Sequence, residues 1–365
     1  MRRVNILRLK PGMRVGRPIY NNSLGELLVK GSELTDSYIK RLQRLGIEFV
    51  WIDDGQDWGI EEKEVIDLKT RIETIRQIRD IALKTKAIGK LSVEPEELYS
   101  TVKEFNKQLF KNSDALYNLS SIQCYDDYTF CHSVNVCILS LMTGISLGYS
   151  NDQLNELGVG ALLHDLGKIK VPEEILNKKG KLTDEEYGVV KMHVTYGYEL
   201  IRDAKNLGEV PALIALEHHE NYDGTGYPNG FSKDKLPEYA QVVAIADRFD
   251  AIASDRVYRK AFSPQEAYEM CAASGNLLFK DNIVKAFLYN IAIYPQGSLV
   301  ELNNGYVAVV LDTPRGYPIF PRVKVLHDGS ERLDKQNIEI SLLDRGDIYI
   351  VRTLNGEEDE LAGII

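Results

Sequence analysis

The sequence has few cysteines and no excess of positive charge. Its 365 residues include four cysteines, and no two of them have the two-residue spacing typical of zinc knuckles or dithiol redox centres. Three of the four, Cys124, Cys131 and Cys137, fall in one helical stretch, so we interpret the cysteines as small, reduced core residues. Acidic residues outnumber basic ones by 54 to 44, for a net charge of −10. This balance argues against a nucleic acid polymer or an anionic membrane as the main partner.

Long apolar segments are also missing. No run approaches the roughly 20 apolar residues needed to cross a bilayer. The N-terminal segment 1–16 is basic but has neither the apolar core nor the cleavage site of a signal peptide. We therefore predict a cytoplasmic protein with no membrane partner. At 365 residues, the chain is long enough for two or three domains with sizeable cores.

Local patterns divide the chain into four regions. Residues 1–58 combine short strand patterns with a helix that begins near Thr35 and stops at Gly46, as in a small α+β domain with a regulatory or interaction role. Residues 59–94 form a charged helical linker whose apolar residues recur every three or four positions. This linker is either a connector packed on its neighbours or a coiled or signalling helix that could join two chains in a homodimer. Residues 95–295 are helical almost throughout, and residues 296–365 form a C-terminal β module.

Two short signals support this division. Thr183 and Glu186 have the spacing of a capping box, which marks the start of a helix. Asn304 and Gly305 lie between two strand patterns, where this pair typically forms a hairpin turn. We therefore predict a mainly α protein, in which a helical bundle lies between a small N-terminal α+β domain and a small C-terminal β module.

Histidine is scarce and concentrated in the helical region. Of six histidines, five lie between positions 132 and 219: His132, His164, His193, His218 and His219. The sixth, His327, lies in the β module, where we interpret it as an ordinary surface or turn residue. A lone histidine on a helix is usually structural, but five that come from several segments of one region indicate a metal site, because imidazole is a common metal ligand.

Carboxylates occur where such a site needs them. Asp165 is adjacent to His164 at the end of an apolar helix that Gly167 is expected to stop. Asp247 follows an almost unbroken apolar run, so its carboxylate must be paired, hydrogen-bonded or bound to a metal. Asp250 has a similar claim, although a helix-terminal or salt-bridge role explains it equally well.

Five imidazoles and two carboxylates are enough for two metal ions. If Asp165 bridges, each metal has roughly four protein ligands, which leaves room for a bridging hydroxide and for substrate oxygens. The set contains no thiolate, so a closed structural zinc site is disfavoured. Nitrogen and oxygen ligands favour Fe or Mn, with Zn, Ni or Co as alternatives.

These residues resemble the motifs of the HD-GYP family, a branch of the HD metal-dependent phosphohydrolases. "HDLGK" at 164–168 is similar to the HD signature, and "HHENYDGTGYP" at 218–228 carries the HHE, DG and GYP elements together. "ADRFDAIASDRVYRKAF" is similar to the aspartate helix that follows them in the family, and "DDYTFCHSVNV" supplies the upstream histidine. The resemblance covers about residues 115–295 and implies an all-helical HD-type metal-binding bundle.

The resemblance also implies a ligand for each position of the site. His132, His164, Asp165 and Asp247 would hold one metal, and Asp165, His193, His218 and His219 would hold the second. Some family members bind a third metal through a carboxylate one turn before the first histidine. That position is Tyr128 here, with Asp127 one residue away, so two metals are favoured.

The substrate implied by the resemblance is cyclic di-GMP, which the family cleaves to pGpG and in some members further to GMP. Asp165 and Lys168 would be the catalytic residues, with Lys168 neutralising a phosphate oxygen. Tyr227, in the glycine-rich loop, is placed to touch a base or phosphate. Arg256 and Arg259, three residues apart, can share a helix face and meet phosphates, whereas Lys260 is more typical of a solvated surface. A hydroxide shared by the metals would attack phosphorus opposite the departing 3′ oxygen.

Two other functions stay open from the sequence. The chain could bind the cyclic dinucleotide without cleaving it and report through residues 61–88. It could also be an HD nucleotidase that acts on ordinary nucleotides, although the GYP loop argues against this. Every expected ligand position is filled, which favours the enzyme over the sensor.

Overall fold

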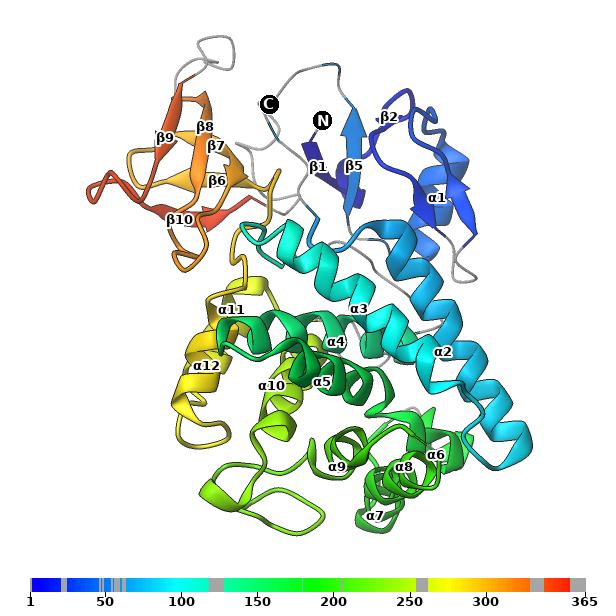
Figure 1. The fold of residues 1–365 in the computed structure, drawn as a ribbon. Helices are drawn as coiled ribbons and strands as arrows, with labels where there is room; N and C mark the ends of the chain where they lie inside the picture. The colour runs from blue at the N-terminus through cyan, green and yellow to red at the C-terminus, as the bar shows by residue number, and fades with distance from the viewer. Residues whose placement is uncertain are drawn as a thin grey trace. The chain divides into compact units, whose positions relative to one another are not determined.

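The structure is a computed structural model that describes residues 2–20, 25–45, 47, 49–53, 55, 60, 64–117, 128–178, 180–204, 206–253, 262–328 and 338–354. The chain forms two compact units. One unit contains the N-terminal and C-terminal modules, and the other contains residues 64–117 and 128–291 (Figure 1). The mainly α fold with a small α+β module before it and a β module after it is confirmed.

The N-terminal module is built from two small antiparallel sheets and one helix. Strands β1 (Arg2–Asn5), β5 (Phe49–Asp53) and β2 (Arg14–Val15) form one sheet in the order β1-β5-β2, and β3 (Ile19–Tyr20) pairs with β4 (Glu26–Leu28). The 3-10 helix η1 spans Ile6–Arg8. Helix α1 (Asp36–Arg44) begins after Thr35, whose hydroxyl accepts a hydrogen bond from the Tyr38 amide. The predicted stop at Gly46 lies outside the described residues.

The C-terminal module is a five-stranded antiparallel sheet. Its strands are β6 (Leu299–Leu302), β7 (Val307–Asp312), β8 (Arg322–His327), β9 (Glu339–Ser341) and β10 (Ile350–Thr353), in the order β10-β6-β7-β8-β9. The predicted hairpin at Asn304–Gly305 is confirmed, with Gly305 at a φ of +83° between β6 and β7. The expectation for His327 is wrong: it ends β8 opposite Val307 and is buried, because it lies within the sheet rather than in a turn.

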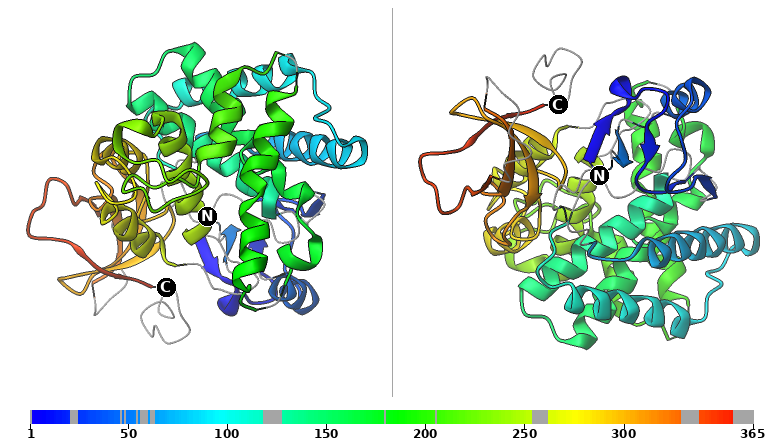
Figure 2. Two further views of the ribbon diagram at one scale, coloured as in Figure 1. Left: turned by 90° about the horizontal axis from the view of Figure 1, so that it is seen from below. Right: turned by 90° about the horizontal axis from the view of Figure 1, so that it is seen from above.

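The second unit is helical. Its α-helices are α2 (Leu68–Ile88), α3 (Pro95–Lys111), α4 (Tyr128–Ser146), α5 (Asn151–Leu163), α6 (Glu173–Leu176), α7 (Asp184–Lys191), α8 (His193–Arg202), α9 (Glu209–Glu217), α10 (Glu238–Ala253), α11 (Pro264–Ala272) and α12 (Asp281–Leu288). Two 3-10 helices, η2 (Leu166–Lys170) and η3 (Lys233–Lys235), lie between them. Helix α9 contacts both α5 and α8, and the bright green helices α8 and α9 run next to one another in the view from below (Figure 2, left).

Helix α4 is the central helix of this unit and contacts α2, α3, α5, α10 and α12. The prediction that no segment is apolar enough for a membrane span is wrong for residues 129–146 of this helix, which meet that criterion by length and composition. The segment is 72% buried inside the unit. Its apolar surface is therefore used in packing against the helices around it.

Local sequence explains where several of these helices begin. The capping box predicted at Thr183 is present: the Thr183 hydroxyl accepts from the Glu186 amide, and the Glu186 carboxylate accepts from the Thr183 amide. Ser150 and Gln153 form the same arrangement at the start of α5. These caps satisfy amides that have no partner within the helix.

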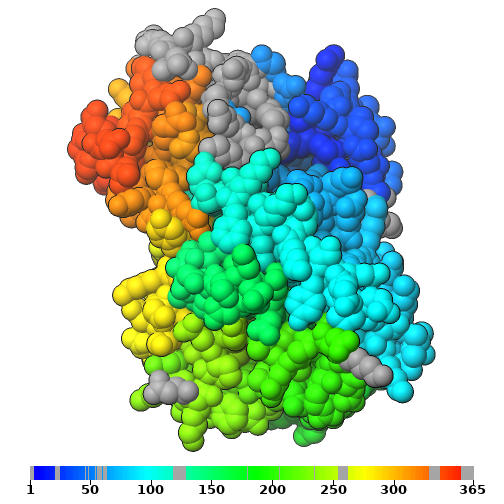
Figure 3. All heavy atoms as spheres, in the orientation of Figure 1, coloured from blue at the N-terminus to red at the C-terminus, as the bar shows by residue number. Residues whose placement is uncertain are grey.

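Helix α2 occupies most of the predicted linker and packs on the bundle. Its apolar side, which includes Ile72, Ile75, Ile78 and Ile81, is buried, and the helix contacts α4 and η2. Glutamine and threonine side chains join α2 to α3, with Thr101 donating to Gln77. In the space-filling view these two helices, in cyan, form one continuous face of the helical unit (Figure 3).

The cysteines are only partly as expected. Cys137 and Cys271 are buried and free, as predicted for core residues. Cys131, by contrast, is disulfide-bonded, which corrects the expectation of a reduced thiol. Cys124 lies outside the described residues.

Candidate metal centre

The structure brings all seven candidate ligands together in the helical unit, in two groups. The first group is His132, His164 and Asp247. The second group is Asp165, His193, His218 and His219. Within each group, the atoms that could bind a cation all lie within 4.8 Å of one another. Metal binding by these residues stays a prediction.

The first group joins three helices. His132 lies in the second turn of α4, His164 caps the end of α5, and Asp247 lies in α10. His132 Nε2 is 2.9 Å from Asp247 Oδ1, and the rings of His132 and His164 meet edge to face with centroids 5.3 Å apart. Contacts of α4 with both α5 and α10 therefore assemble this group.

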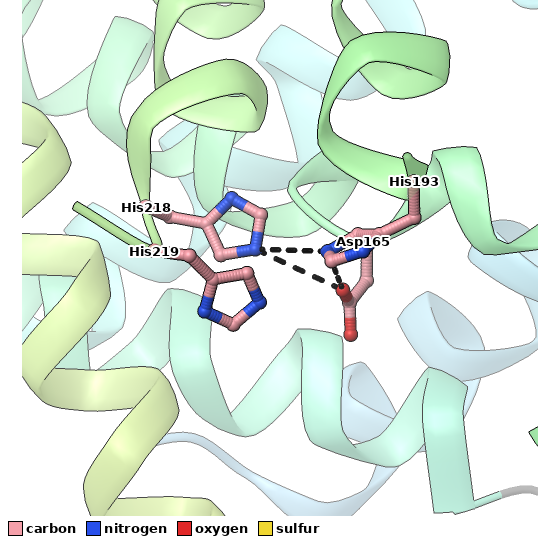
Figure 4. A group of neighbouring side chains, drawn as sticks. All are labelled: Asp165, His193, His218 and His219. Carbon is pink, nitrogen blue, oxygen red and sulfur yellow. Dashed lines mark hydrogen bonds and ion pairs between the residues drawn. The ribbon is translucent and has the colours of Figure 1, made fainter. Parts of the chain in front are cut away.

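The second group gathers at the ends of three other segments. Figure 4 shows His193, at the start of α8, and His218, just after α9, both directed at Asp165. The Nε2 atoms of His193 and His218 lie 3.4 and 3.9 Å from Asp165 Oδ1. His219 follows His218 where α9 has ended, so adjacent histidines can turn toward one point, as the sequence suggested.

Asp165 lies between the groups and presents one oxygen to each. Its Oδ2 is 3.5 Å from His164 Nε2 and 3.8 Å from His132 Nε2, whereas its Oδ1 faces His193 and His218. A carboxylate in this position can bind one cation through each oxygen. This is the geometry that the bridging role predicted for Asp165 requires.

The hydrogen bonds of three histidines determine which ring nitrogen is free. Nδ1 of His164 lies 2.8 Å from the Ala161 carbonyl, Nδ1 of His193 lies 2.7 Å from the Val190 carbonyl, and Nδ1 of His218 contacts the carbonyls of Ile214 and Ala215. A carbonyl only accepts, so Nδ1 carries the proton in each ring. In the neutral rings Nε2 is then unprotonated, and its lone pair points into the site.

The Nε2 atoms of these rings face other acceptors. His193 Nε2 and His218 Nε2 are 3.4 Å apart, and two acceptors cannot hydrogen-bond to each other. Among the residues that the structure describes, His164 Nε2 and Asp165 Oδ1 are buried and have no hydrogen-bond partner. Buried acceptors without donors are costly unless a cation satisfies them. The residues therefore fit a site for metal ions.

Burial keeps the rings of the second group neutral. It lowers the pKa of His193, holds that of His218 well below its usual range, and lowers that of His219 to about 4. Each of these histidines is therefore deprotonated at neutral pH, which is the form that binds a metal.

Charges around Asp165 and His132 act in the opposite direction to burial. Burial alone would raise the pKa of Asp165, but the Lys168 ammonium and the His164 ring hold it well below the usual range. Burial would lower the pKa of His132, but hydrogen bonds to Asp247 and Asp250 raise it to about 9. Without metal, His132 is therefore an imidazolium between two carboxylates.

Gly167 lets Asp165 and His193 of the second group approach each other. A Cβ at this position would lie 1.9 Å from the His193 carbonyl oxygen and 2.5 Å from the Gly197 amide nitrogen. The glycine therefore permits η2 to pack directly on α8, which brings Asp165 next to His193. The expectation that Gly167 stops the preceding helix needs correction, since α5 ends at Leu163 and Gly167 lies within η2.

The glycine-rich loop folds back over the second group. Tyr227 stacks on His219, with ring centroids 4.8 Å apart, and its amide donates to the His219 carbonyl. A Cβ on Gly226 would lie 2.3–2.5 Å from the backbone of residues 219–221, so only glycine fits there. Burial, with nearby Tyr187 and the carboxylates of both groups, raises the pKa of the Tyr227 phenol.

Of the basic residues predicted to bind phosphate, Lys168 is the one that the structure places beside the candidate ligands. Its Nζ lies 2.5 Å from Asp165 Oδ2, one helical turn further along the chain. Arg256, Arg259 and Lys260, predicted or weighed for phosphate binding, lie outside the described residues. Asp127, weighed for a third metal, lies outside them as well.

Two residues near the site, Glu220 and Lys191, were not assigned a role from the sequence, and a third, Asp250, was expected in a helix-terminal or salt-bridge role. Glu220 accepts hydrogen bonds from the amides of residues 229, 230 and 231 and so braces the loop that carries Tyr227. Lys191 Nζ lies 5.1 and 5.7 Å from the ring centroids of Tyr187 and Tyr227. Asp250 Oδ2 is 2.7 Å from His132 Nδ1. Asp250 follows Asp247 by three residues on an apolar helix, and this spacing was the available signal.

Comparison with known proteins agrees with this geometry. Residues 108–281 match the model of an HD domain family, and residues 299–362 match a KOW domain associated with HD domains. The cyclic di-GMP phosphodiesterase PA4108 of Pseudomonas aeruginosa is 31% identical over 332 residues, which cover 83% of this chain and 80% of that protein.

Two further matches agree with these. The cyclic di-GMP phosphodiesterase response regulator RpfG of Xanthomonas campestris pv. campestris is 34% identical over 224 residues, 61% of this chain and 58% of that protein. The solved structure of Bd1817, an HDG"Y"P protein from Bdellovibrio bacteriovorus, has a similar fold with a TM-score of 0.50. That match has 17% identity and covers 78% of this chain and 97% of the other.

Proposed function

Since the chain belongs to the HD-GYP family of cyclic di-GMP phosphodiesterases, we propose that it hydrolyses cyclic di-GMP to the linear dinucleotide pGpG with two divalent metal ions. The reaction breaks one of the two phosphodiester bonds. A water oxygen adds to phosphorus, the 3′ oxygen leaves, and the ring opens.

One observation supports this proposal above the others. Unprotonated Nε2 atoms surround a carboxylate whose two oxygens face different groups of ligands, and among the described residues His164 Nε2 and Asp165 Oδ1 lack the donor that each would need in a purely structural role. Two metals, when bound, would acidify water and stabilise the charge that develops on the phosphate.

The remaining work falls to the side chains around the ligands. Lys168, beside Asp165, is placed to neutralise a phosphate oxygen and to favour the charged form of the bridging carboxylate. Tyr227 and Lys191 lie over the second group, where an aromatic ring and an ammonium can hold a base and a phosphate. Glu220 keeps the Tyr227 loop in place.

The metals are proposed to be Fe or Mn. The ligand groups supply only imidazole nitrogen and carboxylate oxygen, which suit these ions, and both groups leave coordination positions for substrate and water. Elemental analysis of protein purified without oxygen tests this assignment, and also tests whether two or three metals are bound.

Turnover decides whether the protein is an enzyme. Protein loaded with Mn²⁺ or Fe²⁺ under reducing conditions should convert cyclic di-GMP to pGpG. Chromatography measures the product, and a longer time course shows whether GMP forms. Tight binding without product would instead indicate a sensor. Faster cleavage of ordinary nucleotides in a substrate panel would indicate a nucleotidase.

The apolar side of α2 is buried within its own chain, which leaves less of the helix for the homodimer proposed through residues 59–94. We propose that residues 64–94 belong to the catalytic domain, with which they form one compact unit. The cytoplasmic location and the regulatory role of residues 1–58 stay predictions.

A further inference from the structure

His132 is oriented differently from three other histidines of the centre. His164, His193 and His218 direct Nδ1 at carbonyls three or four residues earlier in their own segments. His132 Nδ1 instead lies 2.7 Å from Asp250 Oδ2, a residue 118 positions away in α10. A carboxylate on the outer nitrogen of a ligating histidine fixes the ring and makes it a better metal ligand.

The other oxygen of Asp250 continues the hydrogen bonds away from the centre. Asp250 Oδ1 accepts from Asn135 Nδ2 at 2.9 Å, and Asn135 Oδ1 accepts from Arg71 Nη2 at 2.7 Å. A guanidinium only donates and a carboxylate only accepts, so the Asn135 amide satisfies both neighbours in one orientation alone. His132 and Asn135 are three residues apart and share a face of α4.

Arg71 comes from α2 and is held in place there. Arg71 is only 2% exposed, and its guanidinium lies 5.9 Å from the centroid of the Tyr117 ring. Burial of a charged side chain requires polar partners, which here include Asn135. Arg71 is in the first turn of α2, where the Asp67 carboxylate caps the helix and Gln108 of α3 accepts from the Asp67 amide.

We propose that Arg71 is a positioning residue for the metal bound by the first group, acting through Asn135 and Asp250 on His132. This inference rests on the metal sites of the proposed function. It makes the first turn of α2 part of the metal centre, although no α2 residue reaches a metal. Because the hydrogen bonds end at His132, they affect the first site and leave the second, held by His193, His218 and His219, unchanged.

The test measures binding of Mn²⁺ alone to metal-free full-length protein, by calorimetric titration and by electron paramagnetic resonance. Wild-type protein should bind two ions. In Arg71→Met and in Asn135→Leu, the affinity of one site should fall about 10–100-fold, the range found when an outer partner of a metal ligand is removed. The second site should keep its wild-type affinity.

A double variant tests whether the residues act in series. If Arg71 works through Asn135, Arg71→Met combined with Asn135→Leu should weaken the first site no more than either substitution alone. Losses that add would show that the two residues act separately and would overturn the proposal. Arg71→Lys, which keeps a donor for Asn135, should recover part of the affinity.

A control separates positioning from general loosening of α2. Ile75, one turn after Arg71, is buried and outside the hydrogen-bonded series, so Ile75→Ala should lower the melting temperature but leave both Mn²⁺ affinities unchanged. If Ile75→Ala weakens the first site as much as Arg71→Met does, or if Arg71→Met weakens both sites together or neither, the proposal is wrong. If Arg71→Met does not fold, Asn135→Leu decides alone. Wild-type protein that binds no Mn²⁺ would instead overturn the proposed function.

Discussion

The two halves of the metal centre are held in place by different means. In the second group, His193 and His218 are oriented by carbonyls three or four residues earlier in the chain. In the first group, His132 is oriented by Asp250 and contacted by Asp247, both more than a hundred residues away. The second group therefore depends mainly on local structure, as His164 of the first group does, whereas His132 depends on the packing of α10 against α4.

The charge of the two halves differs as well. Burial lowers the pKa of the histidines in the second group, so their lone pairs are available at neutral pH. In the first group, Asp247 and Asp250 outweigh burial and raise the pKa of His132 to about 9. A cation that binds there must first replace a proton on His132. Before a metal binds, the histidines of the second group are thus neutral, whereas His132 of the first group is protonated, and both groups share the Asp165 carboxylate.

The largest effect is expected from removal of that shared carboxylate. Asp165→Ala should lower turnover of cyclic di-GMP by at least about 10³-fold, the scale found when an essential catalytic group is removed. It should also reduce metal binding in both groups, because Asp165 contacts histidines of each. Metal content and pGpG formation are the measurements. Asp152→Ala, on the exposed start of α5, is the matched control.

If the halves were independent, the Asp165→Ala protein would keep one tightly bound metal. That result would remove the bridging role of Asp165. Wild-type turnover in the variant would contradict the proposed reaction itself.

Removal of the metals should destabilise the helical unit and leave the stability of the N-terminal and C-terminal modules unchanged. A ligand present at 100 times its Kd stabilises the folded state by about 2.7 kcal/mol. Each kcal/mol corresponds to roughly 2–4 °C for a unit of this size, so two metals at that excess should raise its melting temperature by roughly 10–20 °C. Calorimetry with and without a chelator measures the difference, and added Mn²⁺ should restore it. A melting temperature that does not change with the chelator would show that the buried acceptors do not bind metals.

Gly167→Ala should open the contact between η2 and α8 within the second group. The added Cβ would collide with the His193 carbonyl, which must move, at a cost of about 3 kcal/mol. Because α8 carries His193, the second site should lose Mn²⁺ affinity more than the first. Thermal unfolding and Mn²⁺ titration give the two readouts.

Gly188→Ala is the matched control for that substitution. Gly188 lies within α7 and a Cβ there meets nothing within 4 Å, so alanine should be neutral or should stabilise the helix by up to about 1 kcal/mol. Equal destabilisation by the two substitutions would contradict the close-approach role of Gly167.

The smallest effect is expected at the loop over the second group. Glu220→Ala leaves three backbone amides without their carboxylate, so the loop that carries Tyr227 should loosen. The KM for cyclic di-GMP should rise by about 10-fold, while metal content stays at the wild-type value. Asp223→Asn, at an exposed carboxylate of the same loop, should change KM little. Loss of metal from the Glu220 variant would place this residue with the ligands instead.

Features with local causes could be predicted from the sequence. The capping box at Thr183 and the hairpin at Gly305 depend on residues two or three positions apart, and both are present. The surroundings of Cys131 and His327 were predicted wrongly, because a disulfide and a position within a sheet depend on distant residues. Residues 129–146 are apolar because α4 is surrounded by other helices, which the count of apolar residues alone did not reveal.

The sequence by itself determined the ligand types, their grouping through a recognised motif pattern, and the Nδ1 contacts of His193 and His218, since each of these contacts spans a single helical turn. Tertiary structure alone decided which oxygen of Asp165 faces which group. It also decided that hydrogen bonds link His132 in series to Asp250, Asn135 and Arg71. Those partners are 64 to 118 residues apart. No local pattern selects them, because their distances depend on how α2, α4 and α10 pack against one another.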